Sequence, residues 1–325
     1  MNTYYVAWWN VENLFDINNA PGRPDWLQKK LNSELKGWTT AVRDKKLAQL
    51  SGIIRQMNGG AGPDLLGVCE VENKTVMDML VASLAPLGRV YAVKHHDASD
   101  ARGIDVGFIY DTARLTAEAD FFHVIQKRSA TRDLYQVNFR TAAGNLLIAI
   151  GNHWPSRSGG EWESEPYRMM AGETLAYWHE RIREEVGDDA GILAMGDFND
   201  EPFNRSMTTY ALSGNSRAKV TRAQNPRFFN LMWPFLGQGV GSHYFDNFPN
   251  VLDQFIVSKG LLTKGSGIEV KKASDDSYPV AIERFAEMVS GGTYPSPIRF
   301  SRPSAKDYNA NGYSDHFPIS VILTE

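Results

Sequence analysis

Short apolar segments that end in polar residues recur along the chain. Residues 4–9, 65–69, 147–150 and 192–195 are apolar or aromatic, and each run is too short for a helix, so the pattern predicts buried strands. A polar or charged side chain follows each run within two residues. Because α/β proteins commonly carry their chemistry at strand ends, these polar residues are the first candidates for a functional site.

The middle of the chain predicts antiparallel pairing. Strand-like runs follow one another with turn residues between them and little room for helices, at 89–93, 104–110, 121–125, 135–139 and 146–150. Helical patterns are found at 42–57, 71–84 and 166–186, and a further helix is expected at 280–289. No internal repeat or linker-like segment interrupts the sequence, which predicts one compact domain over residues 1–325.

Composition narrows the class of protein. The chain has 325 residues, 42% of them hydrophobic, as in a globular protein with a large core. Its net charge of −4 argues against a protein that coats nucleic acid non-specifically. A single cysteine excludes an internal disulfide and suggests a reducing compartment.

Targeting signals are absent from the sequence as it stands. No basic segment precedes the first apolar run, and no run reaches the length of a membrane span. These features predict a cytoplasmic protein, or a secreted or periplasmic one if a leader has been removed. Nothing in the sequence points to a protein partner.

Gly196-Asp197-Phe198-Asn199 ends the apolar run at residues 192–195. Gly196 permits a sharp turn, after which Asp197 and Asn199 stand at the strand end. Strand-to-turn junctions often use Asp and Asn for local hydrogen bonds, so the tetrapeptide also has a purely structural interpretation. Its combination with the other strand-end motifs favours chemistry.

Two further strand ends carry oxygen donors. Asn10 opens a polar cluster that is either a turn or a ligand-facing strand end. Glu70 is either a first-turn residue favoured by the dipole of the following helix or a ligand of a hard cation. Glu72 and Asn73 could serve the helix cap, which leaves Glu70 free for the second role.

A histidine and three other polar residues complete the candidates. His153 precedes a loop with small residues and Arg157, whose exposed N–H groups and forked guanidinium predict an anion site; a structural histidine is the alternative. Asp105 is either an ordinary edge acid or the partner of a histidine. Asp253 interrupts the apolar run 251–257, where an unpaired carboxylate is costly, so a donor or cation is expected beside it.

Together these motifs resemble, in order, those of the endonuclease/exonuclease/phosphatase superfamily, and the resemblance covers nearly the whole chain. The matching motifs are Trp9-Asn10-Val11-Glu12-Asn13, Leu66-Gly67-Val68-Cys69-Glu70, Arg102-Gly103-Ile104-Asp105, Asn152-His153-Trp154, Gly196-Asp197-Phe198-Asn199, Leu252-Asp253 and Ser314-Asp315-His316. The resemblance implies an α/β (α+β) fold, a four-layer α/β/β/α sandwich of two mixed sheets with the site at one end. It is strongest for the deoxyribonuclease-like and bacterial nuclease-like branches, because apurinic endonucleases lack a histidine where this chain has His153.

The resemblance also implies a metal site. Glu70 is similar to the principal Mg²⁺ ligand of the family, with Asn10 and Asp315 as direct or water-mediated ligands. Mn²⁺ is a possible substitute. Oxygen donors with retained waters suit this ion.

The remaining roles come from the same resemblance. Asp197 resembles the residue that orients or deprotonates the attacking water. His316, paired with Asp253, resembles the histidine that contacts the scissile phosphate, and His153, with Asp105 as its expected partner, resembles a second histidine that serves the leaving group. Asn152, Arg157 and Asn199 are expected to bind phosphate, and Asn199 has the alternative role of holding Asp197.

The chemistry implied is in-line hydrolysis of a phosphodiester, most simply by a nuclease that cleaves DNA or RNA. The alternative keeps the fold and changes the substrate to a phospholipid, an inositol phosphate or a nucleotide, which the acidic net charge favours. A catalytically silent binding protein would be expected to have lost Glu70, Asp197 or His316, and all three are present. The sequence contains neither a Gly-x-Ser-x-Gly nucleophile turn nor a His/Cys cluster with zinc spacing.

Overall fold

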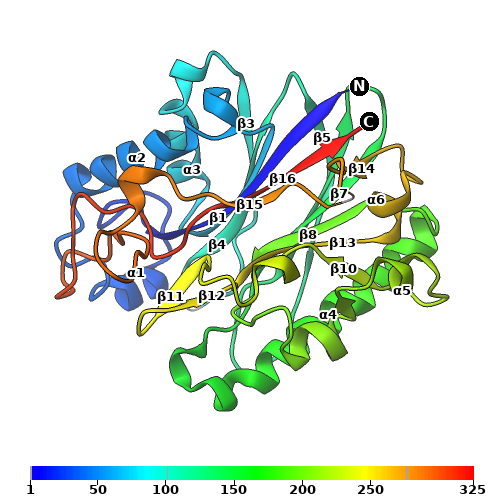
Figure 1. The fold of residues 1–325 in the computed structure, drawn as a ribbon. Coiled ribbons are helices and arrows are strands. Elements are labelled where there is room, and N and C mark those ends of the chain that lie inside the picture. The colour runs from blue at the N-terminus through cyan, green and yellow to red at the C-terminus, as the bar shows by residue number, and fades with distance from the viewer. Residues whose placement is uncertain (1, 101, 276) are drawn as a thin grey trace.

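Two mixed sheets pack face to face in the computed structural model of the chain, which describes residues 2–100, 102–275 and 277–325 (Figure 1). The first sheet has the order β14 (Glu269–Val270), β16 (Ile319–Thr324), β1 (Thr3–Leu14), β2 (Leu65–Val71), β4 (Asp105–Asp111), β3 (Tyr91–His95), with β15 (Val280–Ile282) also paired to β16. The second has the order β5 (Leu115–His123), β6 (Leu134–Thr141), β7 (Leu146–His153), β8 (Ile192–Asp197), β13 (Asp253–Val257), β10 (Phe228–Asn230), β9 (Ser213–Gly214).

Helices and a small hairpin surround the sheets. The helices are α1 (Asp25–Leu31), α2 (Thr40–Ile54), α3 (Lys74–Ala82), α4 (Glu161–Val186), α5 (Arg217–Thr221) and α6 (Lys259–Thr263). Single helical turns occur at Asn58–Gly60, Ala85–Leu87, Arg157–Gly159, Ser206–Tyr210, Trp233–Phe235 and Ala286–Met288. The hairpin consists of β11 (His243–Phe245) and β12 (Phe248–Asn250).

Buried hydrophobic clusters lie between the two sheets and on the outer face of each. Between the sheets, Trp8 and Phe108 of the first sheet belong to one buried cluster with Met195 and Phe255 of the second. On the outer face of the first sheet lies a cluster with side chains of α2 and α3, and on the outer face of the second lies one with side chains of α4. This order of layers confirms the expected α/β/β/α sandwich. Because both sheets share the central cluster, we propose that the chain is a single domain.

The strand pairing brings distant parts of the chain together. β1 and β16 pair antiparallel from Thr3 with Thr324 to Trp8 with Ile319, so the two ends of the chain lie side by side (Figure 1). β1 and β2 pair in parallel, so their C-terminal ends lie at the same end of the sheet. Among the residues that the structure describes, no helix combines the length and the apolar character needed to span a bilayer.

Two expectations for the helices need correction. The helix expected at 280–289 is wrong: Val280–Ile282 forms β15, because this apolar, partly β-branched segment pairs with β16, and one helical turn follows. α4 begins at Glu161, five residues before Pro166. The buried guanidinium of Arg168 stabilises this extension, because it donates to the backbone oxygen of Glu161 at 2.9 Å and to Ser164 Oγ at 2.6 Å.

The interface between the sheets gives a stability prediction at Gly67. A Cβ atom there would lie 2.5 Å from a ring carbon of Trp8 and 3.3 Å from Met195 Sδ. We expect Gly67→Ala to lower the free energy of unfolding by about 2 kcal/mol through overpacking. Gly52→Ala is the matched control, because a Cβ at this position in α2 meets nothing within 4 Å, and it should be neutral or stabilising. Equal stability of both variants in urea unfolding would contradict the packing argument.

Candidate functional site

Strand ends from both sheets meet at one cleft. β13 pairs with β8 and sets Asp253 opposite Asp197, and β7 sets His153 beside the same Asp197. In the first sheet, Asn10 of β1 pairs with the residue that precedes Glu70 of β2. A cleft of ≈ 580 Å³ is lined by residues of both sheets and of the loops at this end, including Asn10, Glu70, His153, Arg157, Asp197, Asn199, Asp315 and His316. The structure therefore brings most of the expected site residues together.

His316 and Asp253 form a buried ion pair. His316 Nδ1 lies 2.6 Å from Asp253 Oδ2, and the other oxygen of Asp253 accepts a hydrogen bond from Trp8 Nε1 at 3.1 Å. Burial alone would lower the pKa of His316. The carboxylates of Asp253 and Asp197 outweigh burial and raise the pKa well above its ordinary value. His316 is therefore an imidazolium at neutral pH.

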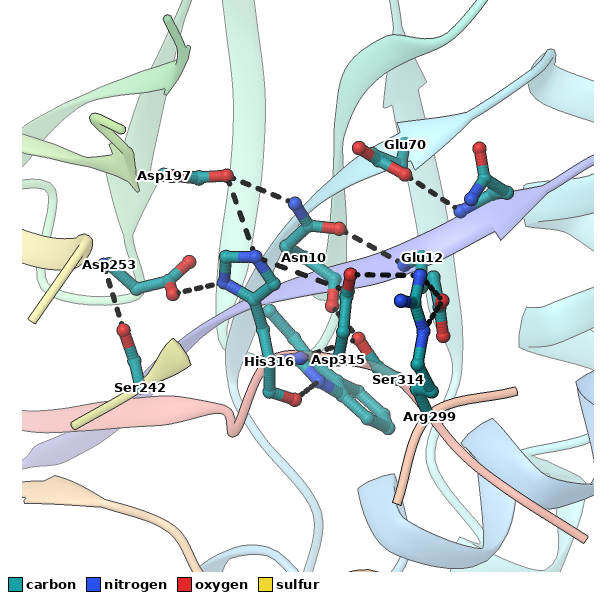
Figure 2. Close-up of polar contacts among 12 residues, drawn as sticks. Asn10, Glu12, Glu70, Asp197, Ser242, Asp253, Arg299, Ser314, Asp315 and His316 are labelled. Atoms are coloured by element: carbon teal, nitrogen blue, oxygen red, sulfur yellow. Dashed lines mark hydrogen bonds and ion pairs between the residues drawn. The ribbon is translucent and has the colours of Figure 1, made fainter. Parts of the chain in front are cut away.

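Asp197 lies on the other side of this imidazolium. Its Oδ2 is 3.8 Å from His316 Nε2 and accepts a hydrogen bond from Asn10 Nδ2 at 3.1 Å (Figure 2). Burial raises the pKa of Asp197 to about 7; His316 opposes this shift and Asp253 adds to it. A carboxyl group with a pKa near neutrality is suited to take a proton from water and to release it again.

The two asparagines expected to bind phosphate have internal partners. Asn152 is fully buried, donates to the backbone oxygen of Ile150 and accepts from Trp154 Nε1, so these contacts hold the strand end, and its contact with phosphate stays a prediction. Asn199 Nδ2 donates to the backbone oxygen of Trp154 at 3.0 Å. The backbone N–H of Asn199 donates to Asp197 Oδ1 at 2.9 Å, which fits the alternative role of holding Asp197.

Arg157 lines the cleft but is already engaged by its surroundings. Its Nε donates to the backbone oxygen of Asn199 at 2.7 Å, and its Nη atoms lie 3.0 Å from Asp200 and 3.2 Å from Glu161. The guanidinium therefore ties the loop after β7 to the loop after β8. Its contact with phosphate stays a prediction.

Glu70 reaches the cleft from an unusual backbone conformation. Its φ is +63°, and the β1–β2 register shifts between Asn10 and Leu14. Such an irregularity turns a side chain away from the regular strand direction. One carboxylate oxygen accepts from the backbone N–H of Asn13 at 2.9 Å, and the other lies 3.7 Å from Arg102 Nη1 and 3.8 Å from His153 Nε2.

Asp315 pairs with Arg299, which is itself bound by Glu12, and the sequence analysis gave neither of these two residues a role in the site. Arg299 Nη2 lies 3.4 Å from Asp315 and donates to Glu12 Oε1 at 2.7 Å (Figure 2). Burial raises the pKa of Glu12, and Asp315 adds to this shift. The only sequence signal was the position of Glu12 beside Asn10, because Arg299 comes from an irregular segment without a pattern.

His153 has no acidic partner at hydrogen-bond distance. Its Nε2 lies 3.8 Å from both Glu70 and Asp197, and its buried Nδ1 lacks a hydrogen-bond partner within the described part of the chain. Burial, followed by nearby cationic groups, lowers its pKa well below the ordinary value. The expected pairing with Asp105 is wrong, because Asp105 lies 3.4 Å from His95 and accepts the backbone N–H of Ala98. Asp105 therefore belongs to a neighbouring cluster with His95, and a catalytic role for it stays a prediction.

His243 is a further residue that sequence reasoning missed. It forms an isolated antiparallel bridge with His316, and the two ring centroids are 4.6 Å apart. Burial, followed by the positive charge of His316, lowers the pKa of His243 to about 3. It is therefore a neutral imidazole packed against an imidazolium. Its strand, β11, has only three residues, which is too short to give a periodic signal.

The oxygen donors in the cleft fit a hard cation. Among the described residues, the Glu70 oxygen near Arg102 and both oxygens of Asp315 accept no hydrogen bond, so they are available to a metal. Close groups of three or more His and acidic side chains are found at His243/Asp315/His316, Asp197/Asp253/His316 and His95/Asp97/Asp105. Glu70 is in none of them, so an ion at Glu70 would have few protein ligands and would retain water, as Mg²⁺ does.

Comparisons with known proteins identify the family of this chain. A family model described as Endonuclease/Exonuclease/phosphatase family matches residues 5–325. The chain belongs to this family. Its enzyme class is that of the family, the metal-dependent phosphoric ester hydrolases. No curated protein matches the sequence.

Solved structures with the same fold are distant in sequence. D. rerio TDP2 complexed with a single-strand DNA product has 12% identity and a TM-score of 0.58, with 100% of both chains covered. The human Nocturnin catalytic domain with bound sulfate has 14% identity and a TM-score of 0.53, with 99% of this chain and 94% of that chain covered. A family protein from Bacteroides thetaiotaomicron has 13% identity and a TM-score of 0.54, with 99% and 97% covered. At these identities the likeness shows the fold.

The ion pair predicts how His316 titrates. We expect Asp253→Asn to lower the pKa of His316 by at least about one unit, because a carboxylate at hydrogen-bond distance is removed. The raised pKa stabilises the native state fully below the unfolded value of about 6.5, and this contribution is lost as the pH rises through the folded pKa. The variant should therefore show a weaker decline of stability above neutral pH.

NMR titration of the imidazole protons measures this shift. Asp105→Asn is the matched control, because its carboxylate contacts His95 and not His316. The assignment of the ion pair would be wrong if both variants left the His316 titration unchanged, or if Asp105→Asn shifted it as much as Asp253→Asn.

Proposed function

We propose that this chain is a Mg²⁺-dependent phosphodiester hydrolase that cleaves nucleic acid by in-line attack of water. The observation that carries the proposal is the placement of the His316 imidazolium 3.8 Å from Asp197, in the cleft that Glu70 also lines. This hydrolysis needs a cationic hydrogen-bond donor for a phosphate oxygen, a base that takes a proton from water, and a ligand for the metal ion. His316, Asp197 and Glu70 are suited to these three roles in that order.

Glu70, Asn10 and Asp315 would hold the metal. Bound there, Mg²⁺, or Mn²⁺ in its place, supplies positive charge that stabilises the phosphate oxygens in the transition state. Arg299 pairs with Asp315, and Glu12 in turn holds the Arg299 guanidinium. The N–H of Asn13 fixes one oxygen of Glu70 and leaves the other free.

The other residues of the cleft accept the proton of water or donate hydrogen bonds to the phosphate. Asp197, with a pKa of about 7, takes the proton of the attacking water, and Asn10 and Asn199 orient its two oxygens. His316 donates from Nε2 to a non-bridging phosphate oxygen while Asp253 holds Nδ1. His153 is neutral, so it offers the leaving oxygen a hydrogen bond and not a positive charge.

A nucleic acid is the substrate that we propose. D. rerio TDP2, which has the same fold, was solved with a single-strand DNA product, and this supports the choice of substrate. Arg102 and Arg157 line the cleft and would lie near phosphates that flank the scissile one. Phospholipid, inositol phosphate and nucleotide substrates are the competing class, and the assay below includes them.

The first test is hydrolysis with Mg²⁺ or Mn²⁺ against EDTA, on plasmid, single-stranded DNA, RNA, inositol phosphate and lipid phosphate. We expect metal-dependent cleavage of nucleic acid, and a loss of about 10³-fold in kcat for Asp197→Ala and for His316→Ala, because each removes a proton-transfer or charge-stabilising group. Asp78→Ala, an exposed acid in α3 paired with Lys74, is the matched control and should keep full activity.

Two results would count against this proposal. Near-normal turnover of a folded Asp197→Ala variant would remove the assigned base. Cleavage of a lipid or inositol phosphate alone, with no nucleic acid turned over, would keep the chemistry and reassign the substrate class.

Glu70 gives a separate prediction for the metal. Glu70→Gln keeps an oxygen for the Asn13 N–H but loses the negative charge. The Mg²⁺ concentration that gives half the maximal rate should therefore rise by about 10-fold or more. Even substitution of residues that only support the ligands lowers metal affinity or activity by about 10–100-fold. Glu118→Gln is the control, since Glu118 pairs with Arg140 on the surface. An unchanged Mg²⁺ requirement and rate would show that Glu70 is not a ligand.

A further inference from the structure

Two exposed phenylalanines stand beside the catalytic cleft. Phe245 and Phe248 flank the turn of the β11–β12 hairpin, are 67% and 74% exposed, and line the same cleft as Glu70 and His316. Large apolar side chains are costly to leave in water, and at the edge of a polar cleft they mark a surface that binds something. None of the roles assigned so far uses them.

The hairpin holds the two rings on one face. Phe245 and Phe248 are opposite partners in the antiparallel register, and such partners project from the same side of a hairpin. Asp246 and Asn247 between them have φ of +46° and +67°, as a tight two-residue turn requires. The rings are therefore presented side by side by a rigid connection.

The base of the hairpin is joined to the catalytic residues. His243 at the start of β11 forms the backbone bridge with His316. Gly241, just before it, packs so closely that a Cβ atom would lie 2.5 Å from the backbone of Asn250. These contacts fix the hairpin relative to the position at which His316 would meet the scissile phosphate.

The charges in the cleft show that contacts other than ion pairs with phosphates must supply the affinity for a nucleic acid. Its described lining includes the carboxylates of Glu70, Glu161, Asp197 and Asp315 but only two cationic side chains apart from histidine, Arg102 and Arg157. Both arginines already have partners, since Arg102 donates to Asn13 and lies near Glu70, and Arg157 contacts Asp200. Binding along a phosphate backbone needs many cations, and this cleft does not provide them.

From these observations we infer that Phe245 and Phe248 form a stacking subsite for an unpaired nucleobase next to the scissile phosphate. The inference rests on the proposed function and narrows it to single-stranded or terminal nucleotides. Aromatic side chains bind bases through their faces without regard to sequence, and a base within a duplex has both faces covered by its neighbours. The hairpin thereby supplies the affinity that the acidic cleft cannot draw from phosphates.

The test compares KM with kcat for a single-stranded oligonucleotide in Phe248→Ala and Phe245→Ala. We expect KM to rise about 10-fold for each variant with kcat unchanged, because base stacking is lost while the reacting groups stay in place. Phe248→Trp should keep or lower KM, whereas Phe248→Leu, which preserves an apolar hairpin without a ring, should behave like Phe248→Ala. Phe203→Ala is the matched control, because Phe203 is exposed but does not line the cleft.

A pair of small substrates isolates the nucleobase. The p-nitrophenyl esters of thymidine 5′-phosphate and of methyl phosphate share a leaving group and differ in the nucleoside. The alanine variants should raise KM for the thymidine ester and leave the methyl ester unchanged. Equal losses on both esters, or no loss on either, would overturn the stacking subsite.

Salt dependence gives an independent readout. With at most two arginines at phosphates, the slope of log KM for single-stranded DNA against log salt should not exceed about 1.4. A slope of about 4 would mean that phosphate contacts supply the affinity, and would contradict the inference.

The outcomes separate this inference from the proposed function. If the wild-type protein cleaves oligonucleotides and the hairpin variants match it, only the stacking subsite fails. If the wild type hydrolyses the methyl ester but no oligonucleotide or thymidine ester, the nuclease assignment fails with it. If Phe248→Ala loses binding to phosphatidylcholine vesicles while KM for oligonucleotides is unmoved, the hairpin serves a lipid surface and the inference is wrong.

Discussion

The burial of two carboxylates beside one imidazolium is the constraint on which the site depends. The β8–β13 register sets Asp197 and Asp253 opposite each other inside the sandwich, where two uncompensated negative charges would oppose folding strongly. His316 supplies the compensating charge, and Trp8, a residue of the central core, donates to Asp253. The His316–Asp253 pair is therefore built on the packing of the two sheets, because its partners come from both of them and from the core residue Trp8.

The strand ends around this pair depart from regular geometry in a consistent way. Glu12, Asn13, Glu70 and Asn199 all have positive φ, which costs free energy for residues other than glycine. Each conformation is held by a hydrogen bond or ion pair within the site, such as the Asn13 N–H to Glu70 and the Asn199 N–H to Asp197. At Glu70 this backbone conformation directs the carboxylate into the cleft.

Sequence reasoning could predict the parts of the site that local physics determines. Asp253 in an apolar strand required a partner, and Asp197 after a glycine turn had to stand at a strand end. It failed where tertiary contacts decide: Arg299 reaches Glu12 across 287 positions of the chain, and Asp105 met His95 of the neighbouring strand instead of His153. Tertiary contacts also decide the structure of the segment at 280–289, because pairing with the edge of β16 favours a strand there over a helix. The layered fold was predictable through the family resemblance, and the strand pattern alone could not have chosen it.

The acidic character of the cleft follows from its chemistry. Cations placed along it to bind phosphates would favour the ionised form of Asp197 and lower its pKa from about 7, which would make it a weaker base in the proposed role, and they would compete with the proposed metal for Glu70. A cleft with few cations suits the proposed base and the proposed metal site, but it lacks the usual source of affinity for the nucleic acid that we propose as substrate. Uncharged aromatic rings would resolve this conflict under the proposed function, because they can stack on a nucleobase without adding charge beside the carboxylates. The position of Phe245 and Phe248 at the rim, joined through His243 to His316, meets both requirements.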